Sequence, residues 1–388
     1  MTKQKIKVAV GMSGGVDSSV SALLLKQAGY EVVGLFMKLW HDPCGTSQNA
    51  CCDDKALADA HLVAKKIGIP LYEVDARKEF KEEVTDYFID EYRNIRTPNP
   101  CVVCNKKIKF GWLLDFAQKL GCEKLATGHY ARVIDDAGNP NIEIRNPKQI
   151  QNSKFKLLKG VDEKKDQSYF LYQLNQDQLS KIIFPVGGMT KPEVRKIAEK
   201  NGLPVFEKAE SQEVCFVSDN DYRAFLRRYL SENSFKPGKI VDLKGEVIGE
   251  HDGLVNYTVG QRKGITQVKS HPSTGLGAGK LKVKSDTTPK YVIGFNLEKN
   301  ELIVGDDKDL FKKEFEIRDA HWDDESKVKS EKLKVKIRYK AQEVPCSISL
   351  IHNSKFLIRL HDKVRATTPG QSAVFYDGDE VIGGGIIQ

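Results

Sequence analysis

The sequence has no apolar run long enough to cross a bilayer, and Met1 to Lys5 lead into a short apolar run without a signal-type segment. We therefore expect a cytoplasmic protein without membrane contacts. Internal repeats and low-complexity tracts are also absent from the sequence. The excess of positive charge is small, a net +8 over 388 residues, which is compatible with a polyanionic partner but does not establish one.

Cysteine is sparse, and among the eight cysteines only Cys101 and Cys104 form a C-x-x-C pair. The absence of a second pair argues against a structural zinc site. Cysteines in a cytoplasmic chain of this size are better explained as free thiols or metal ligands than as structural disulfides. Apolar neighbours predict core packing for Cys122 and Cys346. One glycine- and serine-containing loop holds three further thiols whose roles stay open: Cys44, Cys51 and Cys52.

The glycine-rich segment from Gly11 to Ser19 lacks the lysine of the phosphate loop G-x-x-x-x-G-K-[ST]. Glycines in such a turn let successive N–H groups converge on one anion, and serine hydroxyls add donors where a helix begins. Asp17 stands near the place of the missing lysine, so we expect Mg²⁺ to bridge its carboxylate and a pyrophosphate. The alternative is a tight turn closed by a helix cap. The candidate phosphate-binding residues are Gly11, Met12, Ser13, Gly14, Gly15, Val16, Asp17 and Ser18.

Apolar periodicity predicts an α/β fold for the N-terminal part, with strands alternating with helices. The expected strands cover residues 6–10, 31–38, 71–75 and 124–127. The expected helices cover 18–28, 53–67, 78–95 and 106–120. This order indicates a doubly wound parallel sheet whose ligands lie at the carboxyl ends of the strands.

The texture of the sequence changes beyond about Phe216, where a short helical stretch is followed by turn-rich sequence. From Tyr291 onward, short strands with period-two alternation predict a small antiparallel barrel. We therefore expect three domains: a catalytic α/β domain over 1–215, a small central domain over 216–288, and a C-terminal antiparallel β-barrel over 289–388.

The pair Cys101 and Cys104 directly precedes a basic helical stretch, residues 106–109, and follows two prolines that stiffen the chain. A helix N-terminus and nearby lysines favour thiolate over thiol, and therefore nucleophilic chemistry. Cys215 lies far along the chain, after the break at Pro204. These three cysteines are the candidate reactive thiols.

The segment from Gly11 to Ser19 resembles the signature of the N-type ATP pyrophosphatases, which cut ATP between its α and β phosphates. Further segments, in order over nearly the whole chain, resemble the tRNA-specific 2-thiouridylase family. They are residues 34–38 (GLFMK), 97–100 (TPNP), 104–106 (CNK), 126–130 (ATGHY), 165–172 (KDQSYFLY), 184–187 (FPVG), 194–198 (VRKIA), 260–264 (GQRKG) and 368–376 (TPGQSAVFY).

That resemblance implies an enzyme, an ATP-dependent tRNA sulfurtransferase that acts on the anticodon stem-loop. ATP would adenylate the C2 oxygen of the wobble uridine, and a cysteine persulfide would deliver sulfur, giving 2-thiouridine, AMP and pyrophosphate. Cys215 would carry the persulfide, and Cys104 would free the sulfur and leave a Cys104–Cys215 disulfide. A sulfur-relay protein or a cysteine desulfurase would supply the sulfur.

The resemblance also implies binding roles. Met37 and Gly128 would border the adenine and ribose of ATP. Asn99, Pro100 and His129 would face the target base, with Cys101 beside them. The residues implied to contact tRNA elsewhere are Lys165, Asp166, Gln167, Arg338, Tyr339 and Gln371.

Cys101 is a departure from the family, because many members have an aspartate there, proposed as a general base. Either Cys101 transfers the proton as a thiolate, or Cys101, Cys104 and Cys215 together ligate an iron–sulfur cluster. Three cysteine ligands suit a [4Fe–4S] centre with one open iron that could hold hydrosulfide. Both routes stay open here.

Residues 332–340 (KLKVKIRYK) alternate basic and apolar side chains, so a strand would place cations on one face, where they could track phosphates. The alternative is an exposed strand kept soluble by its lysines. Two other functions remain: an N-type ATP pyrophosphatase ligase acting on a small metabolite, and a non-catalytic RNA-binding protein. The first leaves Cys104 and Cys215 without a role, and the intact Ser13, Asp17 and Ser18 argue against the second.

Overall fold

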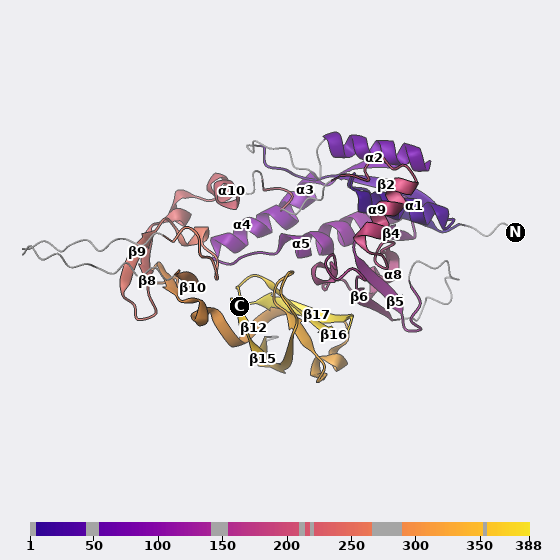
Figure 1. Ribbon diagram of the computed structural model, residues 1–388. Helices are drawn as coiled ribbons and strands as arrows, with labels where there is room; N and C mark the ends of the chain where they lie inside the picture. The colour runs from indigo at the N-terminus through magenta and orange to yellow at the C-terminus, as the bar shows by residue number, and fades with distance from the viewer. Residues whose placement is uncertain are drawn as a thin grey trace, which may run out of the picture.

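The computed structural model describes residues 5–43, 54–140, 154–208, 214–217, 221–265, 289–351 and 355–388. The loop thiols Cys44, Cys51 and Cys52 lie outside these ranges. Figure 1 shows the α/β part with α1, α2 and α9, the β-barrel beneath α4 and α5, and the central strands β8 to β10 at the far end from the N-terminus. No helix in the described part is long and apolar enough to cross a membrane.

The N-terminal part contains a five-stranded parallel sheet in the order β3-β2-β1-β4-β7. Its strands are β1 (Lys7–Gly11), β2 (Glu31–Lys38), β3 (Leu71–Asp75), β4 (Lys124–Ala126) and β7 (Ile182–Ile183). The predicted α/β fold with a parallel sheet is therefore confirmed. The strand β7 was missed by the sequence patterns because two residues carry no periodicity.

Both faces of this sheet are covered because neighbouring residues of a strand point to opposite sides. Val8 and Val10 of β1 pack into one cluster with helices α1 (Val16–Gln27), α2 (Asp54–Ile67) and α9 (Lys191–Lys200). Ala9, between them, packs into a second cluster that includes Phe110 and Leu113. The doubly wound arrangement follows from these two apolar layers.

Two long helical segments next to the sheet contain π-helical turns. One consists of α3 (Arg77–Phe80), η1 (Lys81–Thr85) and α4 (Asp86–Arg93). The other consists of α5 (Pro100–Val103), η2 (Cys104–Trp112) and α6 (Leu113–Lys119).

The expected start of the second segment at residue 106 is wrong, because the helix already begins at Pro100. Proline suits the first helical position, where its missing N–H has no intrahelical partner to lose. The pair Cys101 and Cys104 therefore lies within the first turns of the helix instead of before it.

Residues between β4 and α9 form β5 (Ala131–Asp135), β6 (Phe155–Lys159), η3 (Ser168–Phe170) and α8 (Gln176–Lys181). The hairpin of β5 and β6 joins the barrel sheet through the pairing of Leu158 with Glu380. The hairpin of β5 and β6 therefore forms one continuous sheet with the barrel strands.

The central part contains α10 (Tyr222–Tyr229), η5 (Glu232–Phe235), β8 (Gly238–Val241), β9 (Val247–His251), η6 (Leu254–Asn256), β10 (Tyr291–Asn296) and β11 (Glu301–Gly305). The sheet order is β10-β11-β8-β9. The expectation that barrel strands begin at Tyr291 is wrong, since β11 pairs with β8 and Leu302 packs with Ile240. Alternation identifies a strand but does not show which sheet it joins.

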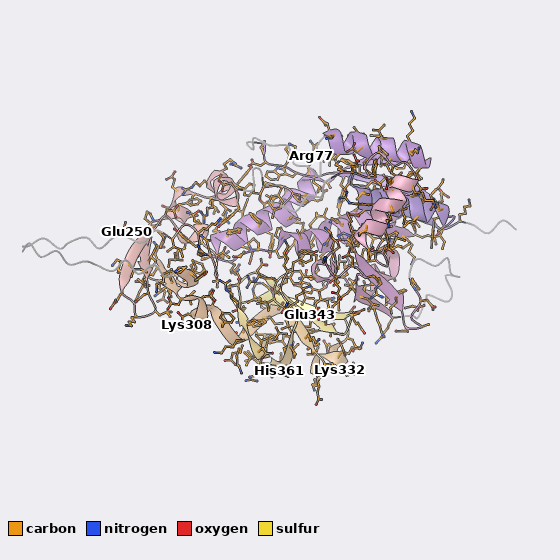
Figure 2. All side chains as sticks on the ribbon, in the orientation of Figure 1. Arg77, Glu250, Lys308, Lys332, Glu343 and His361 are labelled. Carbon is orange, nitrogen blue, oxygen red and sulfur yellow. The ribbon has the colours of Figure 1, made fainter. Side chains whose placement is uncertain are left out.

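The barrel consists of β12 (Phe311–Trp322), β13 (Lys334–Lys336), β14 (Val344–Leu350), β15 (Phe356–Arg365), β16 (Ser372–Asp377) and β17 (Glu380–Ile387), with the short helices η7 (Asp307–Leu310) and η8 (Glu325–Lys329). The order β12-β15-β14-β13-β16-β17 closes through an additional β12–β17 pairing. The predicted C-terminal antiparallel barrel is thus confirmed. Lys332 and His361 lie on its outer side, away from α4 and α5 (Figure 2).

Candidate active site

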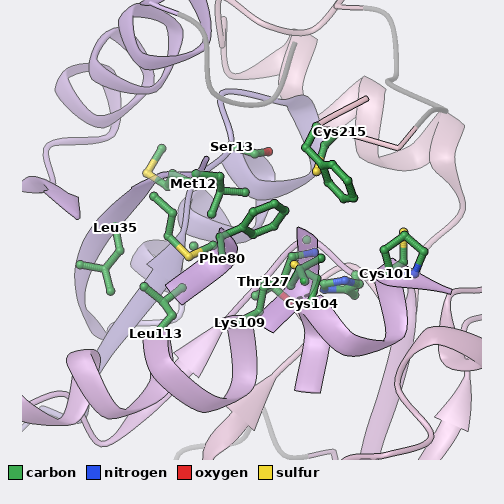
Figure 3. Close-up of a pocket in the computed structure, with 18 of the residues that line it drawn as sticks. Met12, Ser13, Leu35, Phe80, Cys101, Cys104, Lys109, Leu113, Thr127 and Cys215 are labelled. Carbon is green, nitrogen blue, oxygen red and sulfur yellow. Dashed lines mark hydrogen bonds between the residues drawn. The ribbon is translucent and has the colours of Figure 1, made fainter. Parts of the chain in front are cut away.

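A cavity of about 370 Å³ lies at the carboxyl ends of β1, β2 and β4, where a doubly wound sheet binds its ligands. Figure 3 shows Ser13, Cys101, Cys104 and Cys215 around it. Its walls come from segments far apart in the sequence. The lining residues that the sequence singled out are Gly11, Met12, Ser13, Met37, Pro100, Cys101, Cys104, Gly128, His129, Gln167 and Cys215.

The glycine loop between β1 and α1 is built for close backbone approach. Gly14 has φ +68°, and a Cβ there would lie 2.3 Å from the carbonyl oxygen of Ala56. A Cβ at Gly128 would lie 2.7 Å from the backbone nitrogen of Ser18, so the loop after β4 also needs a glycine to pass the start of α1. The glycine loop therefore packs closely against α2 at Gly14, and the loop after β4 packs closely against the start of α1 at Gly128.

The serines of this loop divide into two groups. The hydroxyls of Ser18 and Ser19 donate to the carbonyl oxygen of Gly15 at 3.1 and 2.8 Å. Ser18 Oγ also accepts from the backbone N–H of Ser13 at 3.3 Å. The hydroxyl of Ser19 therefore serves the helix start, while Ser13 lines the cavity.

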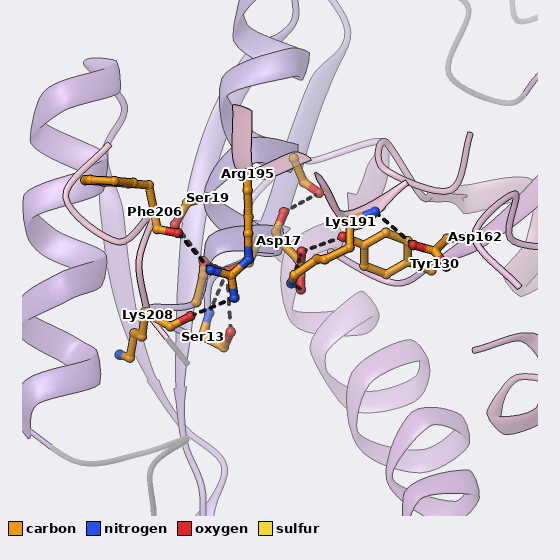
Figure 4. Close-up of polar contacts among 12 residues, drawn as sticks. Ser13, Asp17, Ser19, Tyr130, Asp162, Lys191, Arg195, Phe206 and Lys208 are labelled. Carbon is orange, nitrogen blue, oxygen red and sulfur yellow. Dashed lines mark hydrogen bonds and ion pairs between the residues drawn. The ribbon is translucent and has the colours of Figure 1, made fainter. Parts of the chain in front are cut away.

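Asp17 is held by two side chains that sequence reasoning missed. Lys191 Nζ lies 2.7 Å from both carboxylate oxygens, and the Tyr130 hydroxyl donates to Oδ1 at 2.8 Å (Figure 4). Lys191 is the first residue of α9, where a cation opposes the helix dipole unless an anion is close. The sequence could have indicated this partner, because Thr190 and Glu193 form a capping box that marks the helix start. A lysine at the first position of that helix then points to a nearby anion.

The segment after α9 also folds over the glycine loop. Lys208 Nζ donates to the Gly14 carbonyl oxygen at 3.1 Å and pairs with Asp59 at 2.6 Å. The Arg195 guanidinium donates to the carbonyl oxygens of Phe206 and Lys208 at 3.4 Å (Figure 4). A second lysine thus lies beside the candidate phosphate site.

The three candidate thiols share the cavity wall but differ in exposure. Cys104 is buried, Cys215 is half-buried and Cys101 is exposed. Phe216, next to Cys215, packs edge-on against Phe80 with ring centres 5.6 Å apart, which fixes the chain on the far side of the cavity. The described cysteines form no disulfide, so the Cys104–Cys215 bridge stays a prediction.

The structure treats the two candidate metal groups, the iron–sulfur cluster and Mg²⁺, differently. Within the described residues, no set of three or more Cys, His, Asp and Glu side chains is placed to hold a metal ion, so the [4Fe–4S] alternative gains no support from the structure. Asp17 supplies a single carboxylate at the phosphate loop. One carboxylate fits Mg²⁺, which takes its remaining ligands from phosphates and water.

His129 is buried between aromatic rings. Its ring centre lies 5.7 Å from that of Phe110 and 5.8 Å from that of Phe184, and Nδ1 lies 2.7 Å from the hydroxyl of Thr127. Burial, together with repulsion from Lys109, holds the pKa of His129 well below its ordinary value. The imidazole is therefore neutral at pH 7.

Residues 165–167 support the site from within the protein. The carboxylate of Asp166 is buried and accepts from the backbone N–H of Gly160 and Ser168 at 3.0 and 3.1 Å. Gln167 Oε1 accepts from the backbone N–H of Tyr130 at 3.0 Å, so this side chain holds the residue that in turn holds Asp17. Lys165 is half-buried beside them.

Three further residues expected to contact tRNA or its base lie in protein contacts. The Arg338 guanidinium donates to the carbonyl oxygens of Arg365 and, at 3.1 Å, of Ala366, and burial lowers its pKa. The ring of Tyr339 lies 4.5 Å from that of Phe170. Asn99 is buried.

Comparisons with known proteins agree over the whole chain. Three family models match in order: "tRNA methyl transferase HUP domain" at 6–219, "tRNA methyl transferase PRC-barrel domain" at 223–306 and "Aminomethyltransferase beta-barrel domain" at 312–387. A tRNA-specific 2-thiouridylase MnmA 1 of Caldanaerobacter subterraneus subsp. tengcongensis is 46% identical over 386 residues, covering 98% of each chain. A tRNA-specific 2-thiouridylase MnmA of Clostridioides difficile is 43% identical, also covering 98% of each.

The chain belongs to the tRNA-specific 2-thiouridylase family. A third member, from Pediococcus pentosaceus, is 44% identical and covers 99% of this chain and 95% of its own. The family models are named for methyl transfer, but the full-length relatives are named for thiolation. The resemblance drawn from the sequence motifs is thereby confirmed.

Proposed function

We propose that this chain, as a 2-thiouridylase, binds ATP over the glycine loop and uses it to adenylate the C2 oxygen of the wobble uridine of tRNA. The observation that carries the proposal is the single cavity shared by Ser13 of that loop and the thiols of Cys104 and Cys215. Activation and sulfur transfer both act on C2, so their groups must face one point. A small-metabolite ligase needs only the glycine loop.

The phosphates would lie along residues 11–18, with Met37 and Gly128 beside the adenine and ribose. Both line the cavity at the ends of neighbouring strands, as a nucleotide at this edge requires. Asp17 would hold Mg²⁺, which when bound neutralises charge on the leaving pyrophosphate. Lys191 and Lys208 would add positive charge at the same loop and orient the triphosphate.

Sulfur transfer would use two thiols. A sulfur-relay protein or cysteine desulfurase would convert Cys215 to a persulfide. The Cys104 thiolate then attacks the inner sulfur, forming a Cys104–Cys215 disulfide and releasing hydrosulfide. Hydrosulfide attacks C2 and AMP leaves, and a dithiol reductant restores both thiols. Cys101, exposed at the same wall, would take up the proton, a route that needs no iron–sulfur cluster.

The target base would enter next to Asn99, Pro100 and His129. A neutral imidazole suits an uncharged uracil, because it donates or accepts a hydrogen bond without adding a buried charge. An anticodon loop is already single-stranded, so turning one base into the cavity is cheap. Tyr339, Arg338 and Lys165 would contact the rest of the anticodon stem-loop.

One assay tests the whole function. The protein is incubated with ATP, a sulfane-sulfur donor and unmodified tRNA, and 2-thiouridine and AMP are measured. Both products are expected over multiple turnovers. The variant Cys215→Ser should form neither product, whereas Cys346→Ala, in the barrel core, should still form both. AMP release that does not depend on tRNA would favour the small-metabolite ligase. A colourless, iron-free protein that is still active would exclude the iron–sulfur cluster.

A further inference from the structure

The helix that carries Cys101 and Cys104 is preceded by a short link, residues 95–99, that follows α4. The link leaves α4 at Ile95, which has φ +56°, and enters α5 at Pro100. Only two residues, Asn99 and Pro100, lie between Pro98 and Cys101. Any displacement of the link is therefore passed directly to the thiols.

The barrel binds the backbone of this link through one turn, residues 368–371, which we call the barrel turn. The N–H of Thr97 donates to the Pro369 carbonyl oxygen at 2.8 Å. The amide Nε2 of Gln371 donates to the carbonyl oxygens of Thr97 and Pro98, each at 3.0 Å. Three successive polar groups of the link are thus satisfied by the barrel.

The barrel turn is itself fixed. The N–H of Gly370 donates to the Ile387 carbonyl oxygen, and the N–H of Ile387 to that of Gln371, both at 2.9 Å. A Cβ at Gly370 would lie 2.7 Å from the Thr97 carbonyl oxygen, so link and turn are in close contact. The Thr97 hydroxyl also lies 3.1 Å from that of Thr258 in the central part.

An ionic contact ties the same region to the barrel a second time. Arg96 donates to the carboxylate of Glu91 at 2.6 and 2.8 Å, and Arg318 of β12 lies 3.5 Å from that carboxylate. Glu91 is buried in α4, directly before the link. Contacts with the barrel therefore hold the link at both of its ends.

We propose that the barrel turn positions the cysteine helix, and that Gln371 is its positioning residue. The family resemblance implies that Gln371 contacts tRNA. In the structure, however, its Nε2 donates both of its hydrogens to carbonyl oxygens of the link. Gln371 then acts on the rate of sulfur transfer through Cys101 and Cys104. The proposed function supplies the identity of the reaction, whereas the positioning of the cysteine helix by Gln371 does not depend on it.

The decisive readout is the alkylation rate of Cys101 by iodoacetamide in the free protein, mapped by mass spectrometry, because it needs neither tRNA nor turnover. Gln371→Ala is expected to change this rate at least threefold. The single-turnover rate of thiolation at saturating tRNA should fall about 10- to 100-fold, since small displacements of reacting groups cost that much. The Kd for tRNA should stay within about twofold.

Two further variants distinguish positioning from a general loss of structure. Gln371→Glu places a carboxylate against two carbonyl oxygens and should be worse than alanine, whereas Gln371→Lys keeps a donor and should recover most of the rate. Arg359→Ala, in an exposed ion pair with Glu314 on the barrel, is the control and should change nothing.

A weakened tRNA Kd in Gln371→Ala, with normal alkylation and a normal saturated rate, would overturn the proposal in favour of direct tRNA contact. Equal alkylation rates in the alanine, glutamate and lysine variants would overturn it as well. If the wild-type protein makes no 2-thiouridine, the proposed function fails, yet the alkylation series still decides the positioning role.

Discussion

The ion pair between Lys191 and Asp17 allows stability and catalysis to be separated. Lys191 is only 7% exposed, and its Nζ lies 2.7 Å from both carboxylate oxygens. Removing one partner of a buried pair typically costs about 3–5 kcal/mol. Asp17 keeps the hydrogen bond from Tyr130, and 28% of its side chain is exposed, so water replaces part of the loss. We therefore expect Lys191→Met to lower the free energy of unfolding by about 2 kcal/mol.

The double variant Asp17→Asn, Lys191→Met separates the two roles. It leaves no unpaired charge, so most of the lost stability should return. Catalysis should not return, because the double variant lacks both the Lys191 cation proposed to orient the triphosphate and the Asp17 carboxylate proposed to hold Mg²⁺. Removing such a group slows the chemical step by roughly 10²- to 10³-fold.

Urea unfolding followed by tryptophan fluorescence measures the first effect, and tRNA-dependent AMP release measures the second. Lys196→Met, exposed on the same helix α9, is the matched control and should leave both unchanged. The reasoning is refuted if Lys191→Met unfolds at the wild-type urea concentration, or if the double variant releases AMP at the wild-type rate.

The other expected outcomes concern pH, the glycine loop and tRNA binding. The lowered pKa of buried His129 means that the unfolded state binds the proton first. The free energy of unfolding should therefore fall as pH drops below about 6.5, by up to about 1.4 kcal/mol per unit, and titration curves of His129→Asn should be flatter. Gly14→Ala forces a Cβ against Ala56 and should abolish binding of a fluorescent ATP analogue, whereas Gly29→Ala, also at positive φ but with nothing within 4 Å, should only reduce stability. Arg338→Ala should lower the Tm and reduce the salt slope of tRNA binding by about one, and an unchanged slope would assign Arg338 a structural role alone.

Local patterns predicted the sheet well, because a buried strand or an amphipathic helix is written into consecutive residues. β2 and β3 begin and end at the predicted residues, and α2 ends at the predicted Ile67. The predicted first residue of α2, Asp53, lies outside the described residues. The failures lie where neighbours in space decide. The pairing of β11 with β8 and the two-residue strand β7 depend on partners that periodicity does not name.

The candidate site divides along the same line. Residues 11–18 and the cysteines were proposed from the sequence because each has a local signature of spacing or chemistry. The partners of Asp17 were not, since Tyr130 and Lys191 stand 113 and 174 residues away. A buried lysine is indistinguishable from a surface lysine in sequence unless its position in a helix opposes the dipole, as at the first residue of α9.

Polar residues of a family motif pose the converse problem, because the motif does not say whether a side chain faces the substrate or the protein. Over 332–340, Leu333, Val335 and Ile337 are buried and Lys332, Lys334 and Lys340 are exposed, as predicted. The strand itself is limited to β13 (Lys334–Lys336), and the basic residues Lys336 and Arg338 are half-buried. The exposed lysines can therefore supply electrostatic contact with phosphates. The side-chain amide of Gln371 donates hydrogen bonds to the link before Cys101. Its polar residue type alone is therefore no reason to assign it a contact with RNA. Burial and the direction of hydrogen bonds distinguish residues that are available to contact the substrate from residues that position the thiols.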